Sequence, residues 1–483
     1  MKHYRLIAAL CAALMLTAAC PFVPMMQETA TISAHAEDMT EGDYAYTVDD
    51  DGSATITGYN GEGGAVTIPS ALGGKPVTAI GDEAFKSCAG LTALVIPAGV
   101  TSIGERAFES CKALTAVTIP ASVTEIAYSA FLDCKALAAV TLPNHLTEIA
   151  GFAFGGCTSL TAVVIPEGVE TIGNSAFYGC SSLTDVTIPA SVTDIKSDAF
   201  KGTPWLEAQR EVSPYVVVNG ILIDASTAEG VVVVPEGVTR IGEHSFAHIS
   251  GPTNIVLPES VTSIGMSAFT YCKQLNYVNI PESVTSIGFC TFQGCESLLS
   301  VTIPEGITSI GGYMFYGCTA LTEVNIPESV TEIENGAFMS CTALPSLTIP
   351  ASVTEIGSGV FEGCDALTLS VYKDSAAHTY AQENEIPYVL IDGETPPVDD
   401  APALGDVSGD GEIDAKDASD ILVASTEKAV GHDPGLTADQ IKAADVNKDD
   451  KFDAVDASYI LVYSTMKGTG KNVTFEELTA ADA

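Results

Sequence analysis

Basic residues are scarce in this chain of 483 residues: 20 Lys and Arg stand against 62 Asp and Glu, a formal net charge of −42. The deficit argues against binding to a nucleic-acid backbone, which needs clustered cations, and against docking on an anionic membrane surface. A single Trp argues against an aromatic-rich platform for sugars. Because 46% of residues are hydrophobic and only 17% charged, the chain can form a large core and is not a disordered acidic tail.

A long apolar run occurs only near the start of the chain. Lys2 and Arg5 precede the apolar stretch 6–19, and Ala34-His35-Ala36 offers a small-x-small cleavage site. This pattern predicts a signal peptide over residues 1–36 and an exported mature chain. The alternative is lipid attachment at Cys20, because the residues before it loosely resemble a lipobox. We predict no transmembrane segment in the rest of the sequence.

Phenylalanines and prolines recur with a period of 23 residues between about residues 60 and 365. The one longer step between the phenylalanines, from Phe200 to Phe246, is 46 residues, or twice the period. The prolines from Pro97 to Pro350 keep the same steps. A fixed period of this length predicts a solenoid of stacked coils. The phenylalanines are Phe85, Phe108, Phe131, Phe154, Phe177, Phe200, Phe246, Phe269, Phe292, Phe315, Phe338 and Phe361.

Each repeat has the pattern of two short strands and a turn. Apolar side chains alternate over residues 114–120 until Pro120, which cannot continue a hydrogen-bonded ladder. They alternate again over 123–126, and Phe131 and Cys134 then have a helix-like spacing. One coil cannot bury this apolar set alone, so neighbouring coils must share it. We therefore expect a mainly β solenoid of about thirteen coils of 23 residues.

The repeat motif resembles the BspA-like class of leucine-rich repeats of bacterial surface proteins. The resemblance implies a right-handed superhelix over residues 69–391 and a role in binding rather than catalysis. Residues 201–234 depart from the motif, and Asn219-Gly220 between apolar runs predicts a hairpin there. We interpret this segment as one irregular coil that stays in register. The alternative is an insert that grips a ligand.

Both ends of such an array need covering, because an open coil exposes apolar surface and unpaired strand edges. At the start, residues 44–48 and 54–56 predict a capping hairpin within 37–68. At the far end, a short helix over 375–383 and a strand over 387–391 predict a C-terminal cap within 370–391.

Ten of the thirteen cysteines occupy one slot of the repeat, three residues after a phenylalanine. Thr203 and Ile249 fill this slot elsewhere, so a small or apolar group suffices. Equivalent side chains of parallel coils point the same way, which favours a buried column of thiols over disulfides. No zinc site is expected, because the cysteines of the column are at least 23 residues apart, and Cys290, outside the slot, is expected to be a packed or partly exposed thiol. The ten are Cys88, Cys111, Cys134, Cys157, Cys180, Cys272, Cys295, Cys318, Cys341 and Cys364.

The composition changes after residue 391. Residues 392–403 are rich in proline and acidic side chains, which is typical of an extended linker. Two acidic loops follow, 406–417 and 445–456, with oxygen-bearing side chains at positions 1, 3, 5, 9 and 12. This spacing surrounds Ca²⁺ with hard oxygens, and the backbone carbonyl at position 7, of Glu412 or Lys451, adds a ligand. The side-chain ligands are Asp406, Ser408, Asp410, Asp414 and Asp417 in the first loop, and Asp445, Asn447, Asp449, Asp453 and Asp456 in the second.

The two loops, each followed by an apolar helix, resemble a type I dockerin. We assign residues 404–483 to this small all-α domain. The resemblance implies two calcium ions, held by the residues above, and a cohesin module of a cellulosome scaffold as partner. It further implies that loop positions 10 and 11 help to select the cohesin; these are Ala415 and Lys416 in one loop and Ala454 and Val455 in the other. Because the two pairs differ, symmetric binding in two orientations is not expected.

Together these features predict a secreted, non-catalytic protein of a polysaccharide-degrading complex, held at the cell surface through a cellulosome scaffold. The solenoid would bind an extracellular protein or carbohydrate. The histidines of the mature chain have no partnering nucleophile in the sequence pattern, so no enzyme is expected. The first alternative is an adhesin or host-contact protein, and the weaker one is a polysaccharide hydrolase. The outward-facing strand positions expected to meet the ligand include Ala116, Thr118, Asp185, Thr187, Asn254, Tyr277, Asn279, Glu323 and Asn325.

Overall fold

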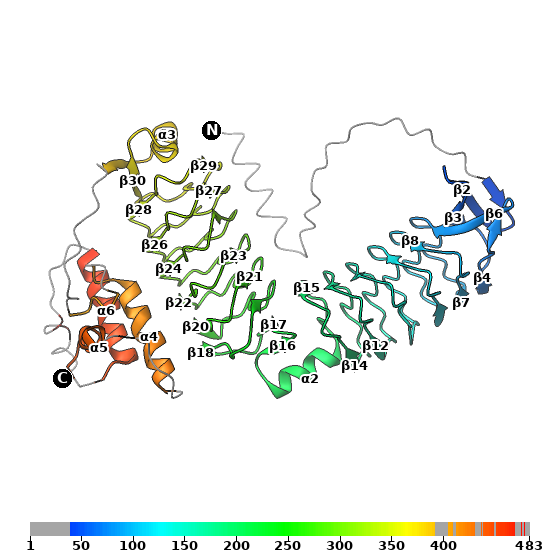
Figure 1. Ribbon diagram of the computed structural model, residues 1–483, viewed down its shortest axis with the longest axis horizontal. Coiled ribbons are helices and arrows are strands. Elements are labelled where there is room, and N and C mark those ends of the chain that lie inside the picture. The colour runs from blue at the N-terminus through cyan, green and yellow to red at the C-terminus, as the bar shows by residue number, and fades with distance from the viewer. Residues whose placement is uncertain are drawn as a thin grey trace. The chain divides into compact units, whose positions relative to one another are not determined.

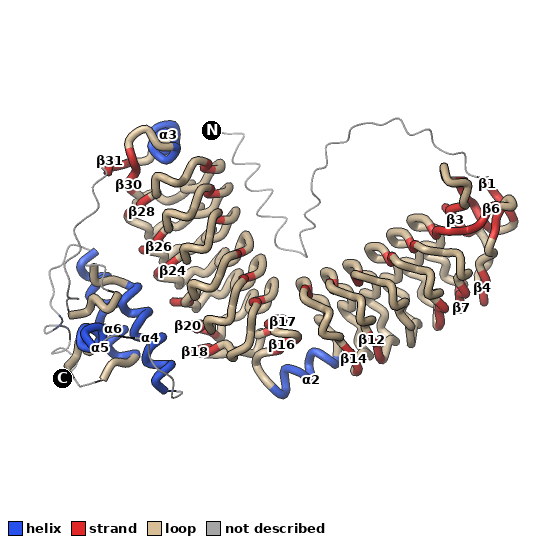
Figure 2. The backbone as a smooth tube through the Cα atoms, viewed as in Figure 1, coloured by secondary structure: helices blue, strands red, loops and turns tan. Residues whose placement is uncertain are grey.

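The computed structural model describes residues 39–391, 404–408, 412–429, 436, 438–448, 451–468, 475 and 478 (Figures 1 and 2). The predicted signal peptide, Cys20 and the linker lie outside these residues. Residues 39–391 form a solenoid of short strands, and the described part of 404–478 is helical. None of the helices in the described part is long and apolar enough to cross a membrane.

Most coils of the solenoid contain two short strands, and many of these strands pair in parallel with the equivalent strand of a neighbouring coil. Leu94 of β7 pairs with Val117 of β9, and Ile103 of β8 pairs with Ile126 of β10. The array completes about 15 turns rather than the thirteen expected. The mainly β solenoid predicted from the 23-residue period is thus confirmed.

The strands fall into two ladders. The first strands of the coils are β4 (Gly64–Thr67), β7 (Leu91–Val95), β9 (Ala116–Thr118), β12 (Ala162–Val164), β14 (Asp185–Thr187), β18 (Gly230–Val233), β20 (Pro252–Val256), β22 (Tyr277–Val278), β24 (Ser300–Thr302), β26 (Glu323–Asn325), β28 (Ser346–Thr348) and β30 (Thr368–Tyr372). The second strands are β6 (Lys75–Ile80), β8 (Ser102–Ile103), β10 (Glu125–Ile126), β11 (Glu148–Ile149), β13 (Thr171–Ile172), β15 (Asp194–Ile195), β17 (Ile221–Asp224), β19 (Arg240–Ile241), β21 (Ser263–Ile264), β23 (Ser286–Ile287), β25 (Ser309–Ile310), β27 (Glu332–Ile333) and β29 (Glu355–Ile356).

The repeat phenylalanines form two stacked columns inside the solenoid. Neighbouring rings lie nearly parallel, with centroids 5.4 Å apart for Phe131 and Phe154 and 5.6 Å for Phe292 and Phe315. Offset stacking of this kind adds to the free energy gained by burying the rings. The period of 23 residues therefore sets the core directly, since each coil supplies one ring to the column.

A column of cysteine thiols runs beside the rings, as predicted. The Cys134 thiol is buried and donates to the carbonyl oxygen of Phe108 at 3.2 Å, and the equivalent contact recurs for the eight other column cysteines from Cys111 to Cys364. Burial raises the pKa of Cys134 to about 12, so this thiol is an inert part of the core. Among the described cysteines none forms a disulfide. Cys290 is half-buried and occupies a left-handed turn position, with a φ of 56°.

Further elements extend the outermost coil at each end of the array. At the start, β2 (Tyr44–Val48) pairs in antiparallel fashion with β1 (Met39–Glu41) and β3 (Ala54–Tyr59), and β5 (Ala71–Leu72) pairs with β6. At the far end, Ser375 accepts from the His378 amide and begins α3 (Ala376–Glu383), and β31 (Tyr388–Ile391) pairs with β30.

The irregular coil contains a helix and a hairpin. Thr203 begins α2 (Pro204–Val212), because its hydroxyl accepts from the Leu206 amide at 3.2 Å. The hairpin joins β16 (Val216–Val218) to β17 through Asn219 and Gly220, which both have positive φ, as predicted. The coil stays in register, but the buried core divides here into two clusters, one ending at Ile221 and the other beginning at Leu222.

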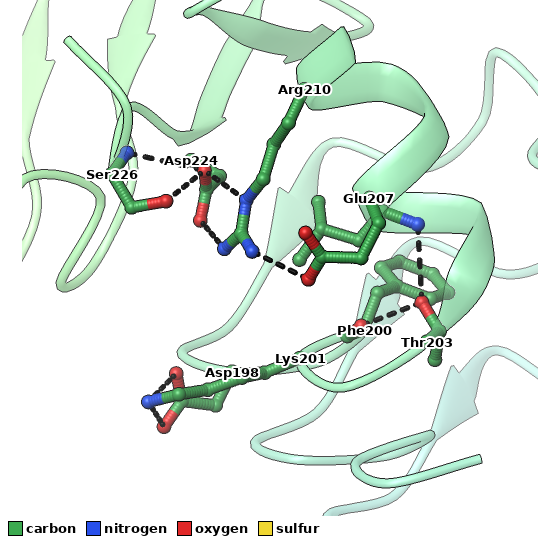
Figure 3. Close-up of polar contacts among 9 residues, drawn as sticks. Asp198, Phe200, Lys201, Thr203, Glu207, Arg210, Asp224 and Ser226 are labelled. Carbon is green, nitrogen blue, oxygen red and sulfur yellow. Dashed lines mark hydrogen bonds and ion pairs between the residues drawn. The ribbon is translucent and has the colours of Figure 1, made fainter. Parts of the chain in front are cut away.

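An ion pair joins the helix of this coil to its second strand (Figure 3). The Arg210 guanidinium donates to both carboxylate oxygens of Asp224, at 2.9 and 2.6 Å. A third nitrogen–oxygen contact reaches Glu207 at 2.6 Å, and Asp224 also accepts from the amide and hydroxyl of Ser226. The helix is therefore held in place by a bidentate pair, the geometry in which Arg binds carboxylates most strongly.

Candidate functional site

The C-terminal domain is built from two loop–helix units and a connecting helix. Its elements are α4 (Ala415–Ala429), α5 (Ala438–Ala444) and α6 (Ala454–Gly468). Val407, Ile421, Phe452 and Ile460 are among the side chains of its small core. The Gln440 amide donates to the Val407 carbonyl at 2.9 Å, which ties α5 to the first loop.

A buried carboxylate closes the first acidic loop. Asp417 lies in the first turn of α4 and is fully buried. Its two carboxylate oxygens accept from the backbone amides of Ser408 at 2.8 Å and Asp414 at 2.9 Å. Asp414 in turn accepts from the Lys416 amide at 2.7 Å, so positions 3, 9, 11 and 12 of the loop are held together.

The second loop repeats this arrangement 39 positions later. Asp456, in the first turn of α6, is also fully buried, and it accepts from the amides of Asn447 at 3.2 Å and Asp453 at 3.0 Å. Asp453 accepts from the Val455 amide at 2.8 Å. Burial is the main cause that raises the pKa of Asp456, and the nearby Asp445 and Asp453 carboxylates add to it. A carboxylate in such a place is stabilised by a cation.

The donor set fits a hard divalent cation. Asp406 and Ser408 are in the described part of the first loop, and the Ser408 hydroxyl is buried without a hydrogen-bond partner there. A buried oxygen in this state costs free energy unless it meets a donor or an ion, and calcium accepts hydroxyl, carboxylate and carbonyl oxygens together. Asp410 and Asp449 lie outside the described residues, and in the described part no three acidic, histidine or cysteine side chains form a complete metal cluster.

The four predicted recognition residues lie at the starts of the two helices. Ala415 and Lys416 begin α4, and Ala454 and Val455 begin α6. Val455 is 48% exposed. At loop position 11, the first half of the domain has the cationic Lys416 and the second half has the aliphatic Val455. The two recognition surfaces therefore differ chemically.

The outward strand positions of the solenoid are only partly available for a ligand. Ala116 and Thr118 of β9 and Thr187 of β14 are exposed. Asn279 instead exchanges two hydrogen bonds with the backbone of Leu257, at 2.6 and 3.1 Å, and therefore joins neighbouring coils. Our expectation that its amide meets a ligand is not supported by this geometry.

Sequence reasoning missed a second kind of surface, at the turns that follow the second strands. Tyr128, Tyr178, Phe289 and Tyr313 are between 40% and 46% exposed there. Composition gave no sign of this, because the few surface aromatics look scattered in the sequence. Tyr128 and Phe289 share one phase of the 23-residue repeat, three residues before the repeat phenylalanine, and this shared phase was a signal that could have revealed them.

Family comparisons agree with the two-part architecture. A family model described as "BspA type Leucine rich repeat region" matches residues 78–207 and 239–368 in six copies, and a "Dockerin type I domain" matches residues 404–463. The repeats cover more than half of the chain, which therefore belongs to the BspA-type leucine-rich repeat family and carries a C-terminal type I dockerin domain. Type I dockerins are calcium binders that attach proteins to cohesins. Both domains are typical of binding modules.

Solved structures of bacterial leucine-rich repeat proteins are similar to the chain. A leucine-rich cell surface protein from Faecalibacterium prausnitzii is 30% identical, over 73% of this chain and 97% of its own, with a TM-score of 0.39. A leucine-rich repeat protein from Bacteroides ovatus is 27% identical, over 74% and 100%, with a TM-score of 0.37. One from Eubacterium ventriosum is 26% identical, over 67% and 93%, with a TM-score of 0.39. A search of curated proteins found no match.

Proposed function

We propose that this is an exported, non-catalytic binding protein of a polysaccharide-degrading complex, with its dockerin bound to a cohesin scaffold in a calcium-dependent way. The observation that carries the proposal is the duplicated loop, in which buried Asp417 and Asp456 accept equivalent backbone hydrogen bonds. The long repeat array then presents a surface to an extracellular ligand. On this proposal residues 37–391 are the capped repeat region and 404–483 the docking domain.

Two calcium ions are proposed, one in each loop. Carboxylates this close repel one another, and a divalent ion relieves the repulsion while it fixes the loop against its helix. Because the ligands come together only in the folded domain, binding free energy contributes to folding. The proposed ligands are Asp406, Ser408, Asp410, Asp414, Asp417 and the Glu412 carbonyl in one loop, and Asp445, Asn447, Asp449, Asp453, Asp456 and the Lys451 carbonyl in the other.

The cohesin surface is proposed to include Lys416 and Val455 with their neighbours Ala415 and Ala454. Lys416 offers a cation to an acidic or polar partner site, whereas Val455 offers an exposed apolar side chain. The two halves would therefore favour one orientation on a given cohesin. The scaffold would place the protein outside the cell.

The alternative is a surface adhesin, in which the array contacts proteins or host cells and the dockerin only attaches it. Exposed polar and small strand positions such as Thr118 and Thr187 support a protein ligand as well as a sugar. A polysaccharide hydrolase is the weaker alternative, and release of reducing sugar by the purified chain would support it.

The test is capture of the full chain on a panel of immobilised cohesin modules, with calcium and with EDTA. We expect capture by at least one cohesin in calcium and its loss in EDTA. A variant with both Asp417→Asn and Asp456→Asn should fail to bind, whereas Glu427→Gln, further along α4, should bind as the unaltered chain does. Capture that survives EDTA, or absent capture in calcium, would overturn the docking proposal.

A further inference from the structure

A pocket of about 380 Å³ lies at the turn edge of the second half of the solenoid. Three successive coils line it where their second strands β19, β21 and β23 lead into turns. Gly265 and Gly288 let the backbones of successive coils approach closely beneath it: a Cβ at Gly265 would lie 2.7 Å from the Glu243 nitrogen, and one at Gly288 would collide with the Met266 nitrogen. The lining residues are Arg240, Glu243, Ser263, Ile264, Met266, Ser286 and Phe289, with the two glycines.

An exposed aromatic surface continues from one wall of the pocket. Phe289 lines the pocket and is 46% exposed, and Tyr313, one coil further, is 42% exposed. The Tyr313 ring lies over Gly336, where a Cβ would be 2.5 Å from the ring carbon Cε1. Tyr316 meets this ring edge-on, with centroids 6.2 Å apart. The ring of Tyr313 is therefore supported from beneath by backbone and fixed from the side, which favours contact through its free face.

The charged groups beside the pocket are already paired. Arg240 lies 3.0 Å from an oxygen of Asp194, and Lys196 lies 3.1 Å from an oxygen of Glu243 and 2.9 Å from Asp194. The charges of these two cations and two anions therefore sum to zero. The pocket still offers guanidinium and carboxylate groups for hydrogen bonds, together with the hydroxyls of Ser263 and Ser286. Such a lining suits a neutral ligand with many hydroxyl groups better than a charged peptide.

We propose that this pocket and the rings of Phe289 and Tyr313 form a carbohydrate-binding site for a neutral pyranose chain. The apolar C–H face of a sugar ring would stack on Phe289, since an aromatic face carries partial negative charge. The hydroxyls would bond to Arg240, Glu243 and the serines. The volume is within the range of small-ligand pockets, about 300–1,000 Å³. A protein partner would need a far larger contact, about 800 Å² on each side.

This inference deepens the proposed function, because it names a ligand class for the repeat array, but it does not depend on cohesin docking. The composition of the chain argued against an extended aromatic platform for sugars, and the proposed site has only a small aromatic surface. The sugar site is in the coils of residues 240–316, and the docking residues are in 404–483, so each can fail without the other.

The experiment measures binding of the full chain to cellohexaose, xylohexaose, mannohexaose and hexagalacturonate by isothermal titration calorimetry. We expect at least one of the three neutral hexasaccharides to bind. Phe289→Ala should lower that affinity about tenfold, and Tyr313→Ala should lower it as well. The matched control is Tyr128→Ala, which removes an equally exposed ring from the first half and should leave the affinity unchanged.

Three outcomes would overturn the site: no neutral hexasaccharide binds, only hexagalacturonate binds, or Phe289→Ala and Tyr128→Ala have equal effects. Phe289→Ala should keep the circular dichroism spectrum and thermal transition of the unaltered chain, which shows that its solenoid is folded. Loss of sugar binding with an unchanged thermal transition would thus support the site. Failed capture of every variant would count against the docking proposal alone.

Discussion

Trp205 covers the end of the first phenylalanine column, with its ring centroid 4.8 Å from that of Phe200 and the planes tilted by 55°. Tyr380 has the same relation to Phe361 at the end of the second column, with centroids 6.0 Å apart. Trp205 belongs to α2 and Tyr380 to α3. The internal helix therefore covers the first half of the array as the terminal helix covers the second.

The hairpin after α2 resembles the one at the start of the array. Strand β16 pairs antiparallel with β17, and β17 continues in parallel into β19. At the start, β2 pairs antiparallel with β3, and β3 continues in parallel into β6. The irregular coil thus combines a closing helix with an opening hairpin, which explains why the buried core divides between Ile221 and Leu222.

We predict that the two halves unfold in separate steps. Trp205 is the one tryptophan of the chain, so its fluorescence reports on the end of the first half. Phe131→Ala should cost about 3–5 kcal/mol and lower the urea midpoint of the fluorescence transition. The matched variant Phe315→Ala in the second half should leave that midpoint in place and shift a circular dichroism transition instead. Equal shifts of the fluorescence midpoint would mean that the array unfolds as one unit.

The Arg210–Asp224 pair is predicted to stabilise the first half through α2. Both side chains are less than 20% exposed, and the guanidinium fork uses two oxygens that Lys cannot bridge in the same way. Asp224→Asn should lower the free energy of unfolding by about 1–3 kcal/mol, read from the Trp205 transition, and Arg210→Lys should also destabilise. As a control, Glu296→Gln breaks an exposed pair with Lys273 and should have no measurable effect. An unchanged midpoint in Asp224→Asn would contradict the prediction.

The repeat explains why so much of the fold could be predicted from the sequence. Phe131 and Cys134 recur at one phase in every regular coil, so their burial followed from periodicity alone. The helix α2 was not foreseen, although Thr203-Pro204 is a typical helix start. Helix α2 and the hairpin together take the place of one 23-residue repeat, so the register of the array is unchanged. The sequence therefore gave no sign that the core divides there, because the division depends on which side chains are in contact.

The two candidate sites differ in what sequence could reveal. The acidic loops have fixed local spacing, so Asp417 and Asp456 could be named from the sequence. The sugar pocket is assembled from residues 23 positions apart, such as Met266 and Phe289, and lies where glycines let successive coils approach closely. Asn279 shows the converse limit, since an outward strand position does not reveal that its side chain bonds to the backbone of the preceding coil.

The thiol at the start of the cysteine column is predicted to be the reactive one in the native array. Contact with the Cys111 thiol is the main cause that lowers the pKa of Cys88, and Cys88 is only half-buried. Since the thiolate is the nucleophile, alkylation of Cys88 by iodoacetamide should rise at lower pH than that of an ordinary thiol, whose pKa is about 8.5. Burial raises the pKa of Cys180 to about 12, so this thiol should stay unlabelled. Peptide mapping by mass spectrometry distinguishes the sites, and a Cys88 rate that rises only above pH 8 would contradict the prediction.

Calcium stoichiometry tests the two loops separately. Because Asp417 and Asp456 each close one loop, Asp417→Asn and Asp456→Asn should each reduce the number of bound ions from about two to about one. Each variant should also weaken the calcium-dependent gain of helical circular dichroism signal, since ion binding and folding are coupled. The control Glu427→Gln alters the charge of α4 outside the loop and should retain both ions. Calorimetric titration of the chelator-treated full chain measures the stoichiometry, and if either variant still binds two ions, the assigned loop residue does not ligate calcium.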